Sequence, residues 1–253
     1  MKDGTKSNID IILPTFNRCY VLWRAITSIL TQDYPYFRLI IVDDGSTDDT
    51  KKLIKQFIDP RLTFISKTHK GVSAARNSGI KIGKSPYIAY LDSDNIWQSN
   101  YLSSMIAALE ANKNAVFAYC GLNYMSQEMS PDYDKEVVVE STGMPVNELT
   151  MENLWNKMIY LDTNQIIHKR NIVKKIGLWD EKLPILTDWD FVIRAYYMFP
   201  ERFISVKKTL VTYIRQVGCS DSISANNNLT NAHKIIYEKY KKIFKTKPSW
   251  VNS

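Results

Sequence analysis

The stretch IDIILPTFNRCYVLWRAITSILTQDYPYFRLIIVDDGSTD, residues 9–48, decides the fold. It opens with a short β-branched apolar run over 9–13, which Pro14 ends, and a second apolar run follows over 37–42. Between the two runs, apolar residues recur at helical spacing over 20–30. Strand, helix and strand in this order predict two strands of one sheet joined by a helix.

The same alternation continues to about residue 120. Its strands are apolar throughout rather than on alternate residues, which is typical of a parallel sheet covered by helices on both faces. We therefore expect an α/β fold with a mainly parallel sheet. The remaining elements expected in this half are strands over 62–65, 87–91 and 115–120 and helices over 47–57, 71–82 and 100–111.

The second half of the chain has a less regular pattern. The polar stretch 132–147 predicts a loop or a hairpin, and the most regular helix is expected over 188–198. The other elements expected here are short helices over 151–157 and 171–176, strands over 203–206 and 210–214, and a final helix over 229–244.

The bulk composition is that of an ordinary globular chain with a sizeable core, since 45% of its 253 residues are hydrophobic and 23% are charged. The net charge of +7 favours an anionic partner, which could be nucleic acid, an acidic membrane surface or a phosphorylated small molecule. The basic residues are dispersed and form no nucleic-acid motif, so we expect no nucleic-acid partner.

The cysteines Cys19, Cys120 and Cys219 are far apart and form no CxxC pair, which excludes a disulfide framework and a zinc site. The polar start over 1–9 has no signal core, and the apolar runs are too short to span a bilayer. These features predict a reducing, cytoplasmic location.

Polar clusters follow three of the expected strands: Thr15-Phe16-Asn17, Asp43-Asp44 and Asp92-Ser93-Asp94. In parallel sheets of this kind, ligands bind beyond the carboxyl ends of the strands. The sequence therefore predicts that these clusters meet at one edge and form a ligand site.

Each cluster could have a chemical role, with a purely structural role as the alternative. Phe16, just past a strand, could stack on a nucleobase or occupy an ordinary turn. Asp44 could accept hydrogen bonds from a base or ribose, or could favour the start of the next helix. Arg76 could reach a pyrophosphate or lie on the surface of its helix. Asp92 and Asp94 supply the hard oxygens that suit Mg²⁺ or Mn²⁺.

The segments PTFNR (14–18), VDDGSTD (42–48), GVSAARNSG (71–79) and YLDSDN (90–95), taken in this order, resemble the family 2 glycosyltransferases of the GT-A fold. The resemblance is closest over about 8–111 and thinner to about 224. It implies a Rossmann-like, mainly parallel sheet flanked by helices in one domain over 1–253. The expected parts are a nucleotide-sugar-binding half over about 8–120, an acceptor-binding half over about 121–228, and a basic C-terminal helix and tail over 229–253.

The resemblance also implies roles for single residues. It assigns Phe16 and Asp44 to the base, Asp92 to the neighbourhood of the ribose, and Asp94 to a Mn²⁺ or Mg²⁺ ion that bridges the diphosphate. Where the family often has a further acidic residue, this chain has Asn95. The other residues assigned to the nucleotide pocket are Pro14, Arg18, Arg76 and Ser93.

In the segment TDWD (187–190), the resemblance makes Asp188 the base that deprotonates the acceptor hydroxyl. The structural alternative for Asp188 and Asp190 is capping of the helix that they open, and Asp190 is expected to be structural. Two weaker candidates remain. His168 either touches a donor phosphate or packs in the core, and Arg215 is a candidate phosphate contact in a glycine-containing loop.

The expected function is an inverting transfer of a sugar from a nucleotide-diphosphate sugar, foremost a UDP-sugar, to a hydroxyl of a glycan or lipid-linked acceptor. By analogy, it would serve bacterial cell-surface polysaccharide or glycolipid synthesis. The alternatives are a nucleotidyltransferase acting on sugar phosphates and an inactive nucleotide-sugar-binding scaffold. The basic helix over 229–244 is either a solvated face or a peripheral contact with the inner face of the membrane.

Overall fold

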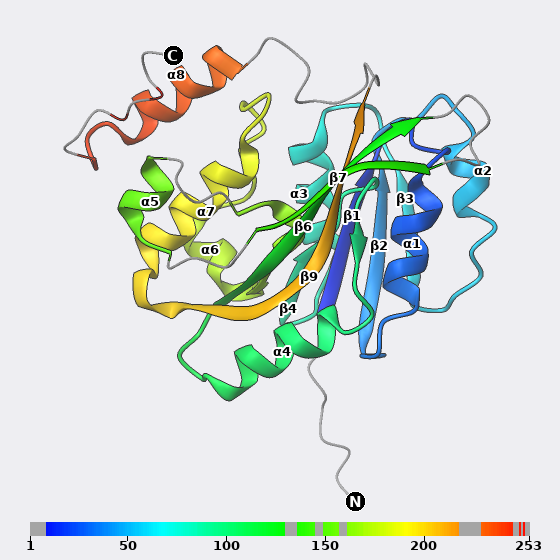
Figure 1. Cartoon of the computed structure of the whole chain (residues 1–253), viewed down its shortest axis with the longest axis horizontal. Helices are drawn as coiled ribbons and strands as arrows, with labels where there is room; N and C mark the ends of the chain where they lie inside the picture. The colour runs from blue at the N-terminus through cyan, green and yellow to red at the C-terminus, as the bar shows by residue number, and fades with distance from the viewer. Residues whose placement is uncertain are drawn as a thin grey trace, which may run out of the picture.

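The computed structural model describes residues 9–129, 136–144, 149–156, 161–217, 229–244, 248 and 250. Side chains are described for the same residues apart from 127–129, 136–144 and 216–217. The described strands form one curled sheet with helices on both of its faces (Figure 1). The expected α/β fold with a mainly parallel sheet flanked by helices is thereby confirmed.

The first four strands are mutually parallel in the order β3-β2-β1-β4. Each connection between them contains a helix, as expected of parallel neighbours. The strands are β1 (Ile9–Thr15), β2 (Phe37–Asp43), β3 (Leu62–Ser66) and β4 (Tyr87–Tyr90). The helices are α1 (Leu22–Leu30), α2 (Thr50–Ile54) and α3 (Val72–Ile82).

The sheet continues from β4 in the order β8-β6-β9-β5, and β7 pairs with β6. In this part only β6 and β9 are parallel neighbours, and the other pairs are antiparallel. The strands are β5 (Ile96–Trp97), β6 (Phe117–Met129), β7 (Glu136–Met144), β8 (Ile166–Lys169) and β9 (Phe203–Val217).

The remaining helices lie around this second part. They are α4 (Tyr101–Ala111), α5 (Met151–Trp155), α6 (Val173–Ile176), α7 (Thr187–Met198) and α8 (Leu229–Tyr240), with the 3₁₀ turns η1 (Thr163–Gln165), η2 (Arg170–Ile172) and η3 (Pro200–Arg202). Helices α5, α7 and α8 gather at the end of the molecule away from β3 (Figure 1).

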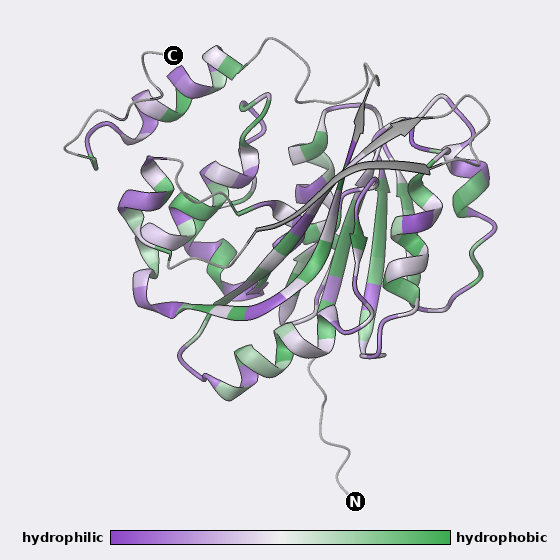
Figure 2. Ribbon diagram, viewed as in Figure 1, coloured by the Kyte–Doolittle hydropathy of each residue, from purple (hydrophilic) through white to green (hydrophobic). Residues whose placement is uncertain are grey.

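Strand β1 shows why its sequence is apolar without alternation. Ile11 and Leu13 belong to the cluster that α1 and α4 cover, whereas Ile12 belongs to the cluster that α6 and α7 cover. All three side chains are fully buried. Each buried side chain of this size contributes about 1.5–3 kcal/mol to stability. The hydrophobic bands of the central strands are visible in Figure 2.

Helix α3 lies unusually close to β1. A Cβ atom added to Gly79 would lie 2.6 Å from Cγ2 of Ile12. The helix therefore needs glycine at this position. The close packing of α3 on β1 places the start of the helix near the edge where β1 and β2 end.

Several elements differ from the expected ones, among them α2, which covers only Thr50–Ile54 of the helix expected over 47–57, and β6, which runs on to Met129. The strands expected over 203–206 and 210–214 are one continuous strand, β9. The two-residue strand β5 was not expected, because it is too short to show a period. The final helix ends at Tyr240 instead of 244. In the stretch 132–147, the described part is β7, which forms a hairpin with β6.

Among the described residues, no helix combines the length and the apolar character needed to cross a bilayer.

Candidate active site

The carboxyl ends of β1 and β2 are joined directly. The amide of Asp44 donates to the carbonyl of Thr15 at 2.8 Å, and the register pairs Thr15 with Asp43. Beyond the strands, the amide of Asn17 donates to Ser46 Oγ at 2.9 Å, and that of Arg18 donates to Thr50 Oγ1 at 3.0 Å. The predicted meeting of these two clusters is therefore present.

Phe16 lies at this edge with 37% of its surface exposed. The ring of His69 stacks on it, with centroids 4.2 Å apart and planes inclined by 24°. The Nδ1 atom of His69 also lies 2.8 Å from Oδ2 of Asp44. The predicted aromatic platform is thus a pair of rings, and sequence reasoning missed His69 because it lies 25 residues beyond Asp44.

Asp44 fixes the turn that leads into α3. Its Oδ1 accepts from the amide of Lys70 at 3.0 Å, and its Oδ2 accepts from the amide of Gly71 at 2.7 Å. Gly45 lets the two loops approach, since a Cβ atom there would lie 2.9 Å from the backbone nitrogen of His69. The carboxylate predicted to contact the base therefore also shapes the loop beside the base platform.

Arg76 projects from α3 into the centre of this edge and is 4% exposed. Its Nη2 donates to Oδ1 of Asp92 at 2.6 Å, and its Nη1 donates to Oγ1 of Thr187 at 3.2 Å. Its guanidinium lies 4.7 Å from the ring centroid of Trp179. Arg76 therefore joins the loop after β4 to the first residue of α7, an arrangement that the surface alternative does not allow.

Asp92 is also held by Asn164. Its amide donates to Asn164 Oδ1 at 2.6 Å, and Asn164 Nδ2 lies 3.4 Å from Asp92 Oδ2. Asn164 is in turn fixed by Asp162, which caps η1 and accepts from the Asn164 amide at 2.9 Å. No local pattern indicates this role of Asn164, because 72 residues separate it from Asp92.

Four carboxylates share this region. Burial raises the pKa of Tyr213, and the nearby charges of Asp162, Asp94, Asp92 and Asp188 raise it further. Burial and the neighbouring carboxylates of Asp188 and Asp92 also raise the pKa of Asp162. The region therefore carries an excess of negative charge beside the cation of Arg76.

Asp94 is the predicted metal residue. Burial, and next the charge of Asp92, raise the pKa of its carboxyl to about 6, while Arg18 acts in the opposite direction. Such an incompletely compensated carboxylate fits a divalent cation, which would neutralise the local charge. The described residues contain no cluster of three or more His, Cys, Asp or Glu side chains around one point. Mg²⁺ is commonly held in proteins by one or two carboxylates, with substrate phosphates and water completing the shell.

The other two predicted pocket residues are built into the backbone of this edge. Pro14 lies in β1 opposite Val42 of β2. Ser93 is buried between Asp92 and Asp94. Both are at the predicted edge, and their contact with a nucleotide stays a prediction.

Asp188 lies in the first turn of α7 and is 8% exposed. Its Oδ1 accepts from the amide of Trp189 at 2.9 Å. Its charge acts on Arg76 and Asp162, which places it beside the other carboxylates of the edge. The structure thus brings the candidate base and the candidate metal residue to one region.

Asp190 points to a different place. It is fully buried, and its partners are Arg194, Lys239 and Tyr240. Residues two apart on a helix do not face the same side, so Asp190 is directed away from Asp188. The expectation that Asp190 is structural agrees with these contacts.

His168 packs in the core and does not reach the edge. It is fully buried, its ring stacks on Phe117, and burial lowers its pKa to about 4. Its Nδ1 lies 3.0 Å from the carbonyl of Lys169, so Nδ1 carries the proton, and Nε2 accepts from the hydroxyl of Tyr90 at 2.9 Å. Of its two expected alternatives, packing is the one that the structure contains.

The expectation that Arg215 lies in a loop is wrong, because strand β9 continues to Val217; Arg215 is exposed on this strand, in register with Ser126 of β6. The adjoining residues 218–220 of the expected glycine-containing loop lie outside the described residues. A phosphate contact by Arg215 therefore stays a prediction.

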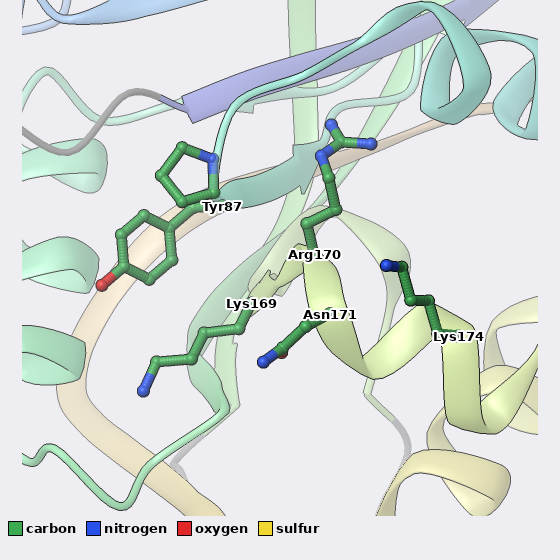
Figure 3. Close-up of a pocket in the computed structure, with 6 residues that line it drawn as sticks. Tyr87, Lys169, Arg170, Asn171 and Lys174 are labelled. Carbon is green, nitrogen blue, oxygen red and sulfur yellow. The ribbon is translucent and has the colours of Figure 1, made fainter.

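A hollow of about 330 Å³ lies at the opposite edge of the sheet, between the start of β4 and the end of β8 (Figure 3). Although Arg170 lines it, this guanidinium is engaged by Asp10 and by the carbonyls of Ser85 and Ile80. The hollow is separate from the candidate active site. Its lining residues are Pro86, Tyr87, Lys169, Arg170, Asn171 and Lys174.

Two solved structures share the fold. The first is S. aureus TarS 1–349 in complex with UDP-GlcNAc, with a TM-score of 0.72 and 18% identity over 92% of this chain and 66% of that chain. The second is the mannosyltransferase PcManGT from Pyrobaculum calidifontis in complex with GDP-Man and Mn²⁺, with a TM-score of 0.66 and 16% identity over 96% of this chain and 66% of that chain. The fold is therefore that of the GT-A glycosyltransferases.

Two relatives from Escherichia coli match in sequence. The putative colanic acid biosynthesis glycosyl transferase WcaA of strain K12 is 29% identical over 81% of this chain and 72% of its own length. UDP-Glc:α-D-GlcNAc-diphosphoundecaprenol β-1,3-glucosyltransferase WfgD is 35% identical over 44% of each chain. The family model described as glycosyl transferase family 2 matches residues 10–176, which contain every motif that carried the resemblance. The chain belongs to glycosyl transferase family 2.

Proposed function

We propose that this chain transfers a sugar from a nucleotide sugar, with UDP-sugars as the first candidates, to a hydroxyl of a glycan or lipid-linked acceptor. The observation that carries the proposal is the contact of Arg76 with both Asp92 and Thr187. This contact ties the loop of the candidate metal residue to the helix of the candidate base. The UDP-glucose named for WfgD and the UDP-GlcNAc bound to TarS support the donor class.

The nucleotide would lie along the edge formed by β1, β2 and β4. The ring pair of Phe16 and His69 offers the base an aromatic face. Asp44 holds the loop beside that face, and Asp92 would lie near the ribose. Arg76 would keep Asp92 oriented and add a positive charge on the path of the diphosphate.

Asp94 would hold a Mn²⁺ or Mg²⁺ ion through its carboxylate oxygens. When bound, the ion supplies positive charge that stabilises a departing nucleoside diphosphate. The Mn²⁺ in the complex of the related mannosyltransferase supports this choice of cofactor. Because burial raises the pKa of Asp94 to about 6, its carboxyl is protonated in more acidic solution, and metal binding there should weaken.

Asp188 would act as the general base. Its carboxylate takes the proton of the acceptor hydroxyl while that oxygen forms a bond to the anomeric carbon of the donor sugar. The bond between this carbon and the diphosphate oxygen breaks, and its electron pair leaves with the diphosphate. Since the acceptor attacks from the face opposite the leaving group, a single displacement inverts the anomeric configuration.

The proposed acceptor is supported by the names of two relatives, and a contact with the membrane by the positive charge near α8. WcaA is named for colanic acid biosynthesis, and WfgD for a lipid-diphosphate acceptor, which supports a role in the assembly of cell-surface polysaccharide on a lipid-linked acceptor. Membrane contact through α8 and the turn that follows it would rest on lysines such as Lys234 in the helix and Lys242 in the turn. Insertion is not expected, because Ile236 and Tyr240 of its apolar stripe are buried against the protein.

The test is release of nucleoside diphosphate from UDP-glucose, UDP-GlcNAc, GDP-mannose and dTDP-glucose, with Asp188→Asn as the variant. Loss of the base should lower kcat by roughly 10² to 10⁴-fold. Asp33→Asn is the matched control, because Asp33 is exposed and lies between α1 and β2. Turnover of Asp188→Asn close to that of the wild type would show that the base is assigned wrongly.

A further inference from the structure

Helix α8 reaches the helix of the candidate base through one buried carboxylate. Asp190 is fully buried, and its Oδ2 accepts from Nε and Nη2 of Arg194 at 3.0 and 2.8 Å. Its Oδ1 accepts from Lys239 Nζ at 2.6 Å and from the hydroxyl of Tyr240 at 2.6 Å. Half of the hydrogen bonds to this carboxylate therefore come from the C-terminal helix.

The start of α7 has no cap of its own. Its N-cap residue, Leu186, is in the left-handed region at φ 60° and ψ 26°, and it makes no capping side-chain hydrogen bond. A residue other than glycine keeps this conformation only when the surrounding structure enforces it. The position of the first turn must therefore come from tertiary contacts.

Those contacts come from three directions. Thr187 accepts from Arg76 at 3.2 Å on the side of the nucleotide edge. The indole of Trp189 donates to the carbonyl of Leu154 in α5 at 2.7 Å. Asp190 is held by α8. Asp188 lies between these anchors, so each of them restricts where its carboxylate can lie.

An apolar cluster also packs α8 against α5 and α7. Trp189 packs edge-on against Trp250 at 5.0 Å between centroids, and Trp155 stacks on Phe244 at 3.9 Å. Ile236 and Tyr240 of α8 belong to the same cluster. The apolar side of α8 therefore packs against the rest of the protein, in the same cluster as Trp189, the residue that follows Asp188.

We infer that α8 is a positioning element of the active site, in which Lys239 and Tyr240 hold the Asp190 carboxylate and thereby fix the turn of α7 that carries Asp188. Neither residue touches the reacting atoms, and both act through Asp190. The inference rests on the proposed role of Asp188 as the base. Lys239 also bridges to Asp180 at 2.9 Å, which ties α8 to the loop before α7.

The experiment compares Lys239→Met, Tyr240→Phe and the double variant with the wild-type full chain. The readouts are kcat and KM for UDP release from UDP-glucose and UDP-GlcNAc, and hydrogen exchange of the amides over 187–193. We expect kcat to fall about 10- to 100-fold in the double variant with KM for the donor unchanged, because displacement of a catalytic group acts on the chemical step. Amide exchange over 187–193 should accelerate while that of β1 and β2 stays the same.

Two controls separate positioning from loss of stability. Lys241→Met removes the lysine that directly follows α8 and pairs with Glu238 and not with Asp190, and it should leave kcat unchanged. Lys239→Arg keeps the charge and should restore most of the kcat that Lys239→Met loses. Wild-type values of kcat and of amide exchange in the double variant would overturn the inference. A wild-type chain that turns over no nucleotide sugar would instead contradict the proposed function, and amide exchange over 187–193 would then decide the positioning role.

Discussion

Arg76 and Asp92 form an ion pair with 2.6 Å between Nη2 and Oδ1, at the point where the end of β4 meets the start of α7. The side chain of Arg76 is 5% exposed, and that of Asp92 is 26% exposed. One guanidinium thus sets the orientation of a carboxylate on the donor side and contacts Thr187 beside the candidate base. The proposed donor and acceptor sites are therefore joined through this single residue.

Arg76→Lys should therefore impair catalysis although it keeps the charge. A lysine can replace only one of the two contacts, whereas the guanidinium makes both at once. The loss of a charged hydrogen bond costs about 1.5–3 kcal/mol, which corresponds to a fall in kcat/KM of roughly 10- to 100-fold.

Steady-state turnover of the donor checks this expectation, with Arg38→Lys as the control. Arg38 is a half-buried arginine of β2 that donates to Thr63 Oγ1, away from the site. Equal kcat/KM values for the two variants would mean that the Arg76 bridge has no role in turnover.

Phe16→Ala should weaken nucleotide binding. The aromatic platform loses one of its two rings, and an aromatic pair is worth about 0.5–1.5 kcal/mol, so the Kd for UDP should rise about 2- to 10-fold. His69→Ala should act in the same direction, because it removes the other ring and its contact with Asp44.

Calorimetric titration with UDP measures these changes. Tyr36→Ala is the matched control, since Tyr36 has the same exposed fraction of 37% but precedes β2 at the far edge of the sheet. Unchanged UDP affinity in both ring variants would place the base elsewhere.

The polar motifs at the strand ends could be read from the sequence, whereas their partners could not. Asp44, Asp92 and Asp94 directly follow apolar strands. Because the carboxyl ends of parallel strands meet at one edge of a sheet, this local pattern was enough to predict that the three residues lie close together. Asn164 contacts Asp92 across 72 positions of the chain, and Thr187 contacts Arg76 across 111 positions. Hydrophobic periodicity does not encode which distant loops come into contact.

Burial settles the role of one residue and the packing of one helix that the sequence pattern left open. The sequence could not distinguish a phosphate contact from packing for His168, because an isolated histidine in an apolar stretch fits both. For α8, the sequence pattern shows an amphipathic stripe but not the residues that pack against it. Trp155 and Trp189 cover that stripe, and no local signal in α8 reveals them.

The buried His168 should make stability depend on pH in a defined direction. Its pKa is lowered to about 4 in the folded chain, against about 6.5 when unfolded, so the unfolded state binds more protons between these values. The contribution of the neutral ring is therefore fully present above pH 6.5 and is lost as the pH falls toward 4. It is about 3 kcal/mol at most.

Urea unfolding of the wild type and of His168→Phe at pH 7 and pH 5 measures this contribution. The variant should lose less stability than the wild type between the two pH values. Comparing the two proteins cancels the opposite contributions of Asp94 and Asp162, whose pKa values are raised. An identical pH dependence in both proteins would contradict the assignment of His168 as a neutral core residue.

Gly79→Ala should destabilise the fold although alanine favours helices. The new methyl group would lie 2.6 Å from Cγ2 of Ile12, so β1 and α3 must separate. Overpacking of this kind costs about 1–3 kcal/mol, more than the roughly 1 kcal/mol that alanine contributes to a helix. Thermal unfolding checks this, with the exposed Lys81→Ala of the same helix as the control. A higher Tm for Gly79→Ala would show that the two elements are not in close contact.

The most direct test of the central claim, a metal-dependent nucleotide-sugar site built on Asp94, is calorimetric titration of the chain with UDP, with and without Mn²⁺. We expect Mn²⁺ to strengthen UDP binding in the wild type and in Asp33→Asn, and to have no effect on Asp94→Ala. Mn²⁺-enhanced binding that persists in Asp94→Ala would contradict the account, as would a wild-type chain that binds neither UDP, GDP nor dTDP under any condition.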